Sequence, residues 1–179
     1  MYKRQIVDDA STDETVAFLK KNHPQVKIVR HQKNQRFAAA CNSGVKEAKG
    51  EIVVLLNNDV FPQSDFLRPL LAHFKNPQVF AVGCKEKEKN QNKTVESGRG
   101  EGEFKKGFLY HWRAKDQNKK DTLWVSGGSM AADRLKWLEL GGMDPLYRPF
   151  YYEDIDLSWR ARKKGWLILF EPQSIVYHR

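Results

Sequence analysis

Two aspartates stand directly after the first apolar run of the chain. Asp8 and Asp9 follow Ile6 and Val7 and precede Ser11. In open α/β sheets, ligands bind at the carboxyl ends of strands, where an acid can accept hydrogen bonds from ribose hydroxyls or a base N–H. The alternative is that both acids belong to a cluster that caps the following helix. These residues alone leave both interpretations open.

A second polar group ends the apolar run over residues 51–56. Asn57, Asn58 and Asp59 follow this run, which places two amides and a carboxylate at one edge of the predicted sheet. Such oxygen ligands suit Mg²⁺ and Mn²⁺, which commonly bridge to substrate phosphates. We predict Asp59 as the first metal ligand. The alternative is a strand followed by an asparagine-rich turn.

His178 follows a short apolar stretch, residues 175–177. A neutral imidazole suits Mn²⁺ and would complete a metal site begun by Asp59. A lone histidine at the end of a strand is, however, more often structural or exposed than a ligand. Its assignment therefore depends on the rest of the chain.

Three acids occur within four positions after the turn-forming Arg148-Pro149. They are Glu153, Asp154 and Asp156. A carboxylate placed at an acceptor hydroxyl can act as a general base, removing the proton as a new bond forms. The alternative is structural, because acids at a helix N-terminus are stabilised by the helix dipole.

The elements that must position these residues alternate through the first half of the chain, as in a parallel sheet covered by helices. Ser11 and Glu14 have the spacing of a capping box and predict the start of the first helix. The predicted strands cover residues 4–7, 26–29, 51–56 and 79–82, and the predicted helices cover residues 11–23, 37–48 and 66–74.

The stretch 85–121 breaks this rhythm, since it is rich in Lys, Glu, Gln, Asn and Gly. We interpret it as a solvated excursion that contains a hairpin or a loop. Order returns with a strand that ends near residue 132, a helix over 134–140, a helix over 154–164, and strands over 166–170 and 175–177. The chain shows no internal repeat and no linker, so we expect a single α/β domain over residues 1–179.

Composition narrows the class of partner. The formal charge of +9 favours anionic partners. The two cysteines have no metal-ligand or redox spacing, and no apolar run is long enough to span a bilayer. We therefore expect a cytoplasmic protein whose membrane contact, if any, is peripheral. The basic and aromatic stretch 104–115 follows no recognition motif, so we predict no nucleic-acid partner.

In this order, these segments resemble the family 2 glycosyltransferases, especially the bacterial rhamnosyltransferase-like members, over nearly the whole chain. The segments that carry the resemblance are Val7 to Asp13 (a nucleotide-binding VDDxSxD segment), Asn34 to Gly44 (NxGFAxxxNxG), Asn57 to Asp59 (the NND form of the metal motif), Gly127 to Met130 and Gly141 to Asp144 (acceptor-side glycines), Glu153 to Arg160 (the acidic segment that supplies the base) and His178.

The resemblance implies a GT-A fold, a Rossmann-like mixed and mostly parallel sheet flanked by helices. It implies a single displacement with inversion and a bound Mn²⁺ or Mg²⁺. Asp154 would be the base, with Glu153 orienting the acceptor or Arg160. The implied metal ligands are Asp59, Asn57 and His178; the donor-side residues are Asp8, Asp9, Asn34, Arg36, Asn42 and Asn58; and the acceptor-side residues are Gly127, Gly128, Trp159 and Arg160.

Three features depart from the family pattern. Arg36 stands where the family has a glycine before Phe37, and Asn57 replaces the first acid of the metal motif. The family's first strand has no counterpart here, which would leave the neighbouring strand edges unpaired. We therefore expect this 179-residue chain to be poorly stable or inactive, and an N-terminally extended version to be active.

The partners that the resemblance implies are a dTDP- or UDP-sugar donor and a glycan or lipid-linked acceptor, in polysaccharide or cell-envelope synthesis. Two alternatives stay open at this point. A sugar-phosphate nucleotidyltransferase shares the α/β plan and the metal chemistry, although it usually opens with a glycine-rich phosphate loop. A non-catalytic glycosyltransferase-like module would follow if Arg36 closed the donor pocket.

Overall fold

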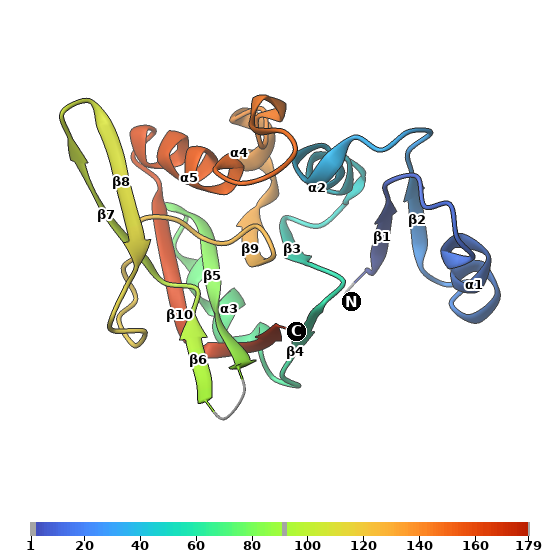
Figure 1. The fold of residues 1–179 in the computed structure, drawn as a ribbon, viewed down its shortest axis with the longest axis horizontal. Coiled ribbons are helices and arrows are strands. Elements are labelled where there is room, and N and C mark those ends of the chain that lie inside the picture. Colours follow the sequence, from blue (N-terminus) through green and yellow to red (C-terminus); the bar gives the residue numbers. More distant parts are fainter. Residues whose placement is uncertain (1–2, 91–92, 179) are drawn as a thin grey trace.

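A mixed sheet with helices on both faces forms the centre of the molecule (Figure 1). The structure is a computed structural model, and it describes residues 3–90 and 93–178. The strands are β1 Gln5–Asp8, β2 Lys27–Arg30, β3 Ile52–Leu56, β4 Val60–Pro62, β5 Val79–Asn90, β6 Lys93–Ser97, β7 Gly100–Lys105, β8 Phe108–Arg113, β9 Ser129–Asp133 and β10 Leu167–His178. The helices are α1 Thr15–Asn22, α2 Arg36–Glu47, α3 Leu67–Ala72, α4 Arg134–Glu139 and α5 Glu153–Lys163, with 3₁₀ turns η1 His73–Lys75 and η2 Pro145–Tyr147.

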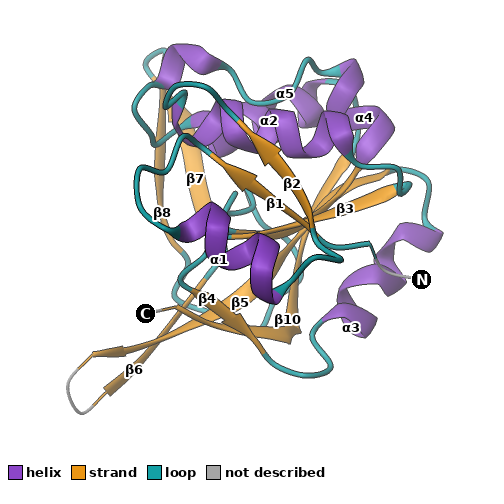
Figure 2. Ribbon diagram, turned by 90° about the vertical axis from the view of Figure 1, so that its right-hand side faces the viewer, coloured by secondary structure: helices purple, strands orange, loops and turns teal. Residues whose placement is uncertain are grey.

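The central sheet has the strand order β3-β9-β5-β10-β4, and β6 pairs with β5. Alternate side chains of its strands point to opposite faces and build two cores. Phe80 and Met130 belong to the core under α2, α4 and α5, while Val82 and Ala131 belong to the core beside α3. Figure 2 shows α2, α4 and α5 gathered on one side of the strands, with α3 on another. The mixed α/β class is thus confirmed.

Strand direction differs from expectation within the described residues. Only β1–β2 and β5–β10 pair in parallel there, whereas β9 runs antiparallel to both β3 and β5. The alternation of strands and helices along the chain predicts the element types, but β9 comes from late in the sequence and inserts between two earlier strands. The prediction of a mostly parallel sheet is therefore corrected to a mixed, largely antiparallel one.

Two local predictions are also corrected. The first helix begins at Thr15, and no side chain caps its Glu14 N-cap; the Ser11 N–H instead donates to Asp8 Oδ1 at 3.2 Å. The two predicted C-terminal strands are one strand, β10, whose register against β5 shifts between Glu171 and Ile175. A bulge of this kind lets one strand continue past a local break in its apolar pattern.

The excursion over 85–121 is largely β structure. β5 continues to Asn90 and pairs with β6, and β7 pairs with β8 as a separate hairpin. The expected hairpin is confirmed. Strands β1 and β2 form a further two-stranded sheet, and the described residues show no ladder between it and the six-stranded sheet. None of the helices within this described part is long and apolar enough to cross a bilayer.

Candidate active site

Asp154 lies in the first turn of α5, partly buried beneath the loop before β9. The Gly127 N–H donates to its Oδ2 at 3.2 Å, and the Ile155 N–H donates to its Oδ1 at 2.8 Å. Burial raises the pKa of Asp154 above its usual value, and the Glu86 charge adds to that rise, against the lowering effect of these two N–H donors. The site therefore holds a carboxylate of increased basicity, as a general base requires.

Glu86 on β5 is a site residue that the sequence analysis missed. The Ser129 Oγ lies 2.6 Å from Glu86 Oε1, and the Ser97 Oγ lies 3.5 Å from Oε2. Two hydroxyl groups thus hold this carboxylate close enough to Asp154 to affect its pKa. Because Glu86 stands in a run of alternating lysines and glutamates, its context in the sequence is that of a solvated strand.

Glu153, the neighbour of Asp154, is only 4% exposed, and its Oε2 has no hydrogen-bond partner among the described residues. Burial raises the pKa of Glu153, and the charge of Asp154 adds to this effect. Cys41 on α2 faces both acids. Burial, followed by the charges of Glu153 and Asp154, raises the pKa of the Cys41 thiol to about 12. Helix α2 therefore closes the apolar side of the acid pair.

The structure does not place Arg160 on Glu153. The Arg160 Nε donates to Asp156 Oδ2 at 2.7 Å, and its two terminal nitrogens donate to the carbonyls of Leu140 and Gly142 at 2.8 and 2.7 Å. The prediction that Glu153 orients Arg160 is corrected, because the i,i+4 spacing of Asp156 and Arg160 favours this pair on the helix surface. Arg160 instead fixes the turn after α4.

The backbone before α5 is strained. Tyr151 and Tyr152 both have positive φ, 83° and 74°, in the left-handed region that non-glycine residues rarely adopt. These two residues turn the chain so that Glu153 and Asp154 enter the helix facing inward. Strain of this kind persists only where the surrounding structure enforces it, and it clusters at functional sites.

The turn at Gly127-Gly128 contacts both the predicted base, Asp154, and the predicted metal motif, at Asn57. The Gly127 N–H contacts Asp154, and the Gly128 carbonyl accepts a 2.9 Å hydrogen bond from the Asn57 N–H. A Cβ on Gly127 would lie 2.8 Å from the Met143 side chain, and a Cβ on Gly128 would lie 2.8 Å from the Asn57 side chain. Both positions therefore need glycine for close approach.

Asp59 and His178 come together, although 118 positions separate them in the sequence. His178 is the register partner of Val60 on β4, and its Nε2 lies 3.3 Å from Asp59 Oδ2. The His178 side chain is 36% exposed and the Asp59 side chain is 49% exposed, which leaves room for further ligands. Residues 3–90 and 93–178 contain no group of three or more His, Cys, Asp or Glu side chains suited to a metal.

This pair of donors fits a divalent cation whose remaining ligands come from water and phosphate. Mg²⁺ in phosphate-handling sites is typically held by one or two carboxylates together with the substrate, and Mn²⁺ also accepts imidazole. Asn57 is hydrogen-bonded to the Gly128 carbonyl through its backbone N–H, while Asn58 is exposed.

Asp9 organises the loop before α2. Its Oδ1 lies 2.7 Å from His31 Nδ1 and accepts from the Gln35 N–H at 2.8 Å, and its Oδ2 accepts from the Arg36 N–H at 2.8 Å. Burial alone would raise the pKa of Asp9, but these three hydrogen bonds lower it below its usual value. His31 in turn lies 2.8 Å from Ser43 Oγ. His31 is a second residue that the sequence analysis missed, since a lone histidine after a strand has no local signal.

The other predicted donor-side residues lie around the same loop. Asp8 is buried, and its Oδ2 lies 3.1 Å from Arg30 Nε. Asn34 Oδ1 accepts from the Arg36 N–H at 3.1 Å. Arg36 itself is the first residue of α2 and has φ of 75°. A glycine adopts this conformation without steric cost, which explains physically why arginine is an unfavourable residue there.

Asn42 makes interior contacts. Its Oδ1 accepts from the Met143 N–H at 2.9 Å and from Trp137 Nε1 at 3.2 Å, and its Nδ2 donates to the Met143 carbonyl at 2.8 Å. These three hydrogen bonds tie α2 to α4 and the segment after it. The predicted donor-side role is corrected to a structural one, because all the polar atoms of the amide are engaged inside the protein.

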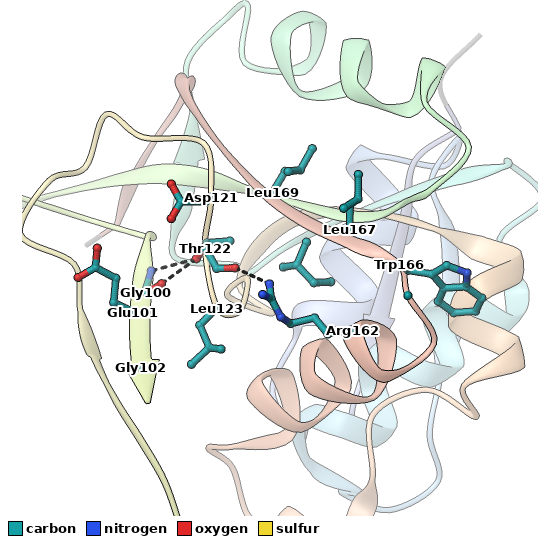
Figure 3. A pocket seen from close by; sticks show the side chains of 12 residues that line it. Gly100, Glu101, Gly102, Asp121, Thr122, Leu123, Arg162, Trp166, Leu167 and Leu169 are labelled. Carbon is teal, nitrogen blue, oxygen red and sulfur yellow. Dashed lines mark hydrogen bonds between the residues drawn. The ribbon is translucent and has the colours of Figure 1, made fainter. Parts of the chain in front are cut away.

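A hollow of about 510 Å³ lies elsewhere. Figure 3 shows it between the start of β7, the chain near Thr122, and the junction of α5 with β10, where Arg162 donates to the Thr122 carbonyl at 3.1 Å. Asp154 stands at the opposite end of α5, and an 11-residue helix is about 15 Å long. This hollow is therefore separate from the candidate active site.

Solved structures with the same fold are glycosyltransferases. GalNAc-T7 with UDP, GalNAc and Mn²⁺ is 20% identical, with a TM-score of 0.78 over 98% of this chain and 37% of that one. The mannosyltransferase PcManGT from Pyrobaculum calidifontis, with GDP-Man and Mn²⁺, is 20% identical, with a TM-score of 0.70 over 98% of this chain and 47% of that one. The fold is thus that of the GT-A glycosyltransferases.

Sequence relatives point the same way. The pre-mycofactocin glycosyltransferase of Mycobacterium tuberculosis is 25% identical over 97% of this chain and 36% of that protein. The N-acetylglucosaminyl-diphospho-decaprenol L-rhamnosyltransferase of the same species is 32% identical, but over only 38% of this chain and 22% of that protein. The chain spans about a third, or less, of the length of these relatives. The family model for glycosyl transferase family 2 matches residues 5–140, so the chain belongs to that family.

Proposed function

We propose that this chain carries the catalytic site of a glycosyltransferase that moves a sugar from a nucleoside diphosphate donor to a glycan or lipid-linked acceptor, with inversion. The proposed setting is polysaccharide or cell-envelope synthesis at the cytoplasmic face of a membrane, and the proposed donor is a dTDP- or UDP-sugar. One observation carries the proposal. The Gly127-Gly128 turn contacts Asp154 on one side and Asn57 on the other, so a base and a metal motif meet at one turn.

Asp154 is the proposed base. An acceptor hydroxyl that attacks the anomeric carbon loses its proton as the new bond forms, and a nearby carboxylate of raised pKa is suited to accept it. The Gly127 N–H donates to one carboxylate oxygen and the Ile155 N–H to the other, which fixes the orientation of the carboxylate. Glu153 is buried beside Asp154, and we propose that it orients the acceptor indirectly, by fixing the start of α5.

Asp59 and His178 are the proposed metal ligands, with Asn57 beside them. A bound Mn²⁺ or Mg²⁺ supplies positive charge that stabilises the departing diphosphate. The protein's own contribution is to hold the carboxylate and the imidazole within 3.3 Å at the end of the central sheet. GalNAc-T7 and PcManGT were each solved with Mn²⁺, which supports the proposal without extending their ligands to this chain.

The donor side is proposed at the loop that Asp9 organises. Asn34, Arg36 and Asn58 are the proposed contacts to the nucleotide, and the exposed Arg36 side chain is available to the diphosphate. Asp8 is buried against Arg30, so we propose that it supports the donor side through this loop. Asp9 acts through the loop, because both of its oxygens already accept hydrogen bonds from the protein. The donors and acceptors of the relatives belong to those proteins, and the relatives support only the reaction class here.

Product analysis tests the proposal. The chain is incubated with UDP-, dTDP- and GDP-sugars and Mn²⁺, and the released nucleotide is identified by chromatography. Release of a nucleoside diphosphate is the expected result. Release of pyrophosphate would instead support nucleotidyl transfer, and a chain that releases neither product, alone and as an N-terminally extended version, would contradict the proposal. Asp59→Ala is expected to remove the dependence on Mn²⁺, whereas the surface control Asp65→Ala leaves it intact.

A further inference from the structure

The β7–β8 hairpin projects from the body of the molecule as a sheet of its own (Figure 1). Its turn is tight and preorganised, since Lys106 and Gly107 both have positive φ, 51° and 83°, as in the primed turns of two-residue hairpins. A Cβ on Gly107 would meet no atom within 4 Å, so the tip lies in open space. The described residues thus present a rigid arm with a free end.

The base of the arm is anchored. The Arg99 guanidinium is buried, and its nitrogens lie 2.6 Å from Glu101 and 2.7 Å from Asp121. The Gly100 N–H also donates to Thr122 Oγ1 at 3.0 Å. A projection whose base is held by ion pairs to a buried guanidinium loses little conformational freedom when it meets a partner, which favours binding.

The inward face of the arm packs on the candidate active site. Phe104 stacks on Trp159 of α5 with ring centroids 6.0 Å apart, and His111 meets Tyr152 edge-on at 5.2 Å. Tyr152 directly precedes Glu153 and Asp154. The position of the arm is therefore coupled to the residues at the start of α5.

The outward face of the arm carries an aromatic ladder. Phe108, Tyr110 and Trp112 alternate along β8 and are 70%, 50% and 45% exposed. Rings this exposed at successive outward positions form an apolar patch, and such patches mark binding surfaces. Tryptophan and tyrosine are the side chains that sit most readily between water and lipid headgroups.

The charges at the tip select an anionic partner. Lys105 and Lys106 stand at the turn, and a hollow of about 300 Å³ is lined by them together with Glu103 and Tyr110. Glu101 stands at the base of the hairpin beside Arg99, which also pairs with Asp121, and Glu103 is the acid next to Lys105 and Lys106 near the tip. Basic groups beside exposed rings match the anionic surface of a phospholipid bilayer.

We propose that the β7–β8 hairpin docks the protein on an anionic membrane, through Phe108, Tyr110 and Trp112 with Lys105 and Lys106. Docking there would hold the start of α5 at the lipid surface, where a lipid-linked acceptor presents its sugar. This inference rests on the proposed function, but its test measures vesicle binding and requires no catalysis.

Vesicle flotation tests the inference with the purified chain. The probes are vesicles of phosphatidylglycerol and phosphatidylethanolamine in equal parts, and vesicles of phosphatidylcholine alone. Binding to the anionic vesicles only is expected. Lys105→Gln with Lys106→Gln should weaken it about 30-fold, given the attraction of two basic side chains to the surface. Phe108→Ser, at a position with no ring contact among the described residues, should weaken it about tenfold.

Matched controls come from α1. Lys20→Gln with Lys21→Gln removes the same charge, and Phe18→Ser removes a ring that is 57% exposed. Both controls should bind like the wild type, and the tryptophan emission of the wild type should shift to shorter wavelength on anionic vesicles but less so in Trp112→Phe. Circular dichroism checks that every variant is folded.

Three results would overturn the inference. They are no binding of the folded wild-type chain to anionic vesicles, equal losses in the α1 controls, and hairpin variants that lose retention on a carbohydrate array while vesicle binding is unchanged. The last result would assign the aromatic ladder to a glycan. A chain that binds vesicles through the hairpin but releases no nucleotide would contradict the proposed function alone.

Discussion

The carboxyl groups of Glu86 and Asp154 interact through their charges, and Asp154 is the proposed base. The Glu86 carboxylate contributes to the raised pKa of Asp154, while burial is the main cause. A base works in its deprotonated form, so turnover falls as the pH falls through the pKa of Asp154. The pair therefore sets the acid limit of activity.

Glu86→Gln removes a negative charge and is expected to lower the pKa of Asp154. The acid limb of kcat/KM for nucleoside diphosphate release should shift to lower pH, and activity at neutral pH should change little. Glu139→Gln, which removes an exposed carboxylate on α4, should leave the limb in place. An unchanged limb in Glu86→Gln would show that the two carboxyl groups do not interact.

The backbone at Arg36 is strained, because an arginine there adopts the left-handed conformation. Arg36 has φ of 75°, so replacement by glycine removes the steric cost of the left-handed conformation. Part of this gain in stability is offset by the greater freedom of glycine in the unfolded chain. Arg36→Gly should raise the free energy of unfolding by about 0.5–1 kcal/mol, measured by urea denaturation. Arg68→Gly inside α3 should instead lower it by about 1 kcal/mol. Destabilisation by Arg36→Gly would contradict the interpretation.

The side-chain amide of Asn42 joins α2 to both α4 and the segment after it. Asn42 uses both its oxygen and its nitrogen on Trp137 and Met143, which fixes the helix that faces Glu153 and Asp154. Asn42→Ala would leave the indole N–H and the Met143 backbone groups unpaired in a partly buried site.

Asn42→Ala is therefore expected to lower the free energy of unfolding by about 2–4 kcal/mol, since more than one polar group loses its partner. The measurement is urea denaturation followed by circular dichroism. Asn22→Ala removes one exposed hydrogen bond at the end of α1 and should cost under about 1 kcal/mol. Equal losses in the two variants would mean that the amide does not join the elements.

Element boundaries were largely predictable where apolar residues recur with a helical period. The predicted helices over 37–48 and 134–140 match α2 Arg36–Glu47 and α4 Arg134–Glu139. The first helix starts later than predicted because Ser11 turns back to Asp8. β5 extends beyond the predicted 79–82 because pairing with β6 and β10, which no local pattern encodes, supports its charged half.

In the whole molecule, some site residues could be predicted from the sequence and others depend on how distant segments pair. Asp59 and His178 were predicted to meet, and they do, because β4 and β10 pair at the edge of the sheet. Glu86 and His31 could not be predicted, since each acquires its role only from strands that fold beside it. Strand order brings β9, late in the chain, next to β3 and so places Ser129 and the Gly127-Gly128 turn at the site.

We propose that the Asp154 carboxylate at the start of α5 is the base of a nucleotide-sugar transferase. The most direct measurement compares Asp154→Asn with the wild type and with Asp65→Asn, a surface control, for both donor binding and nucleoside diphosphate release with Mn²⁺. Asp154→Asn should bind the donor like the wild type but release nucleotide at least about 100-fold more slowly. Full release by Asp154→Asn, with donor binding intact, would contradict this proposal.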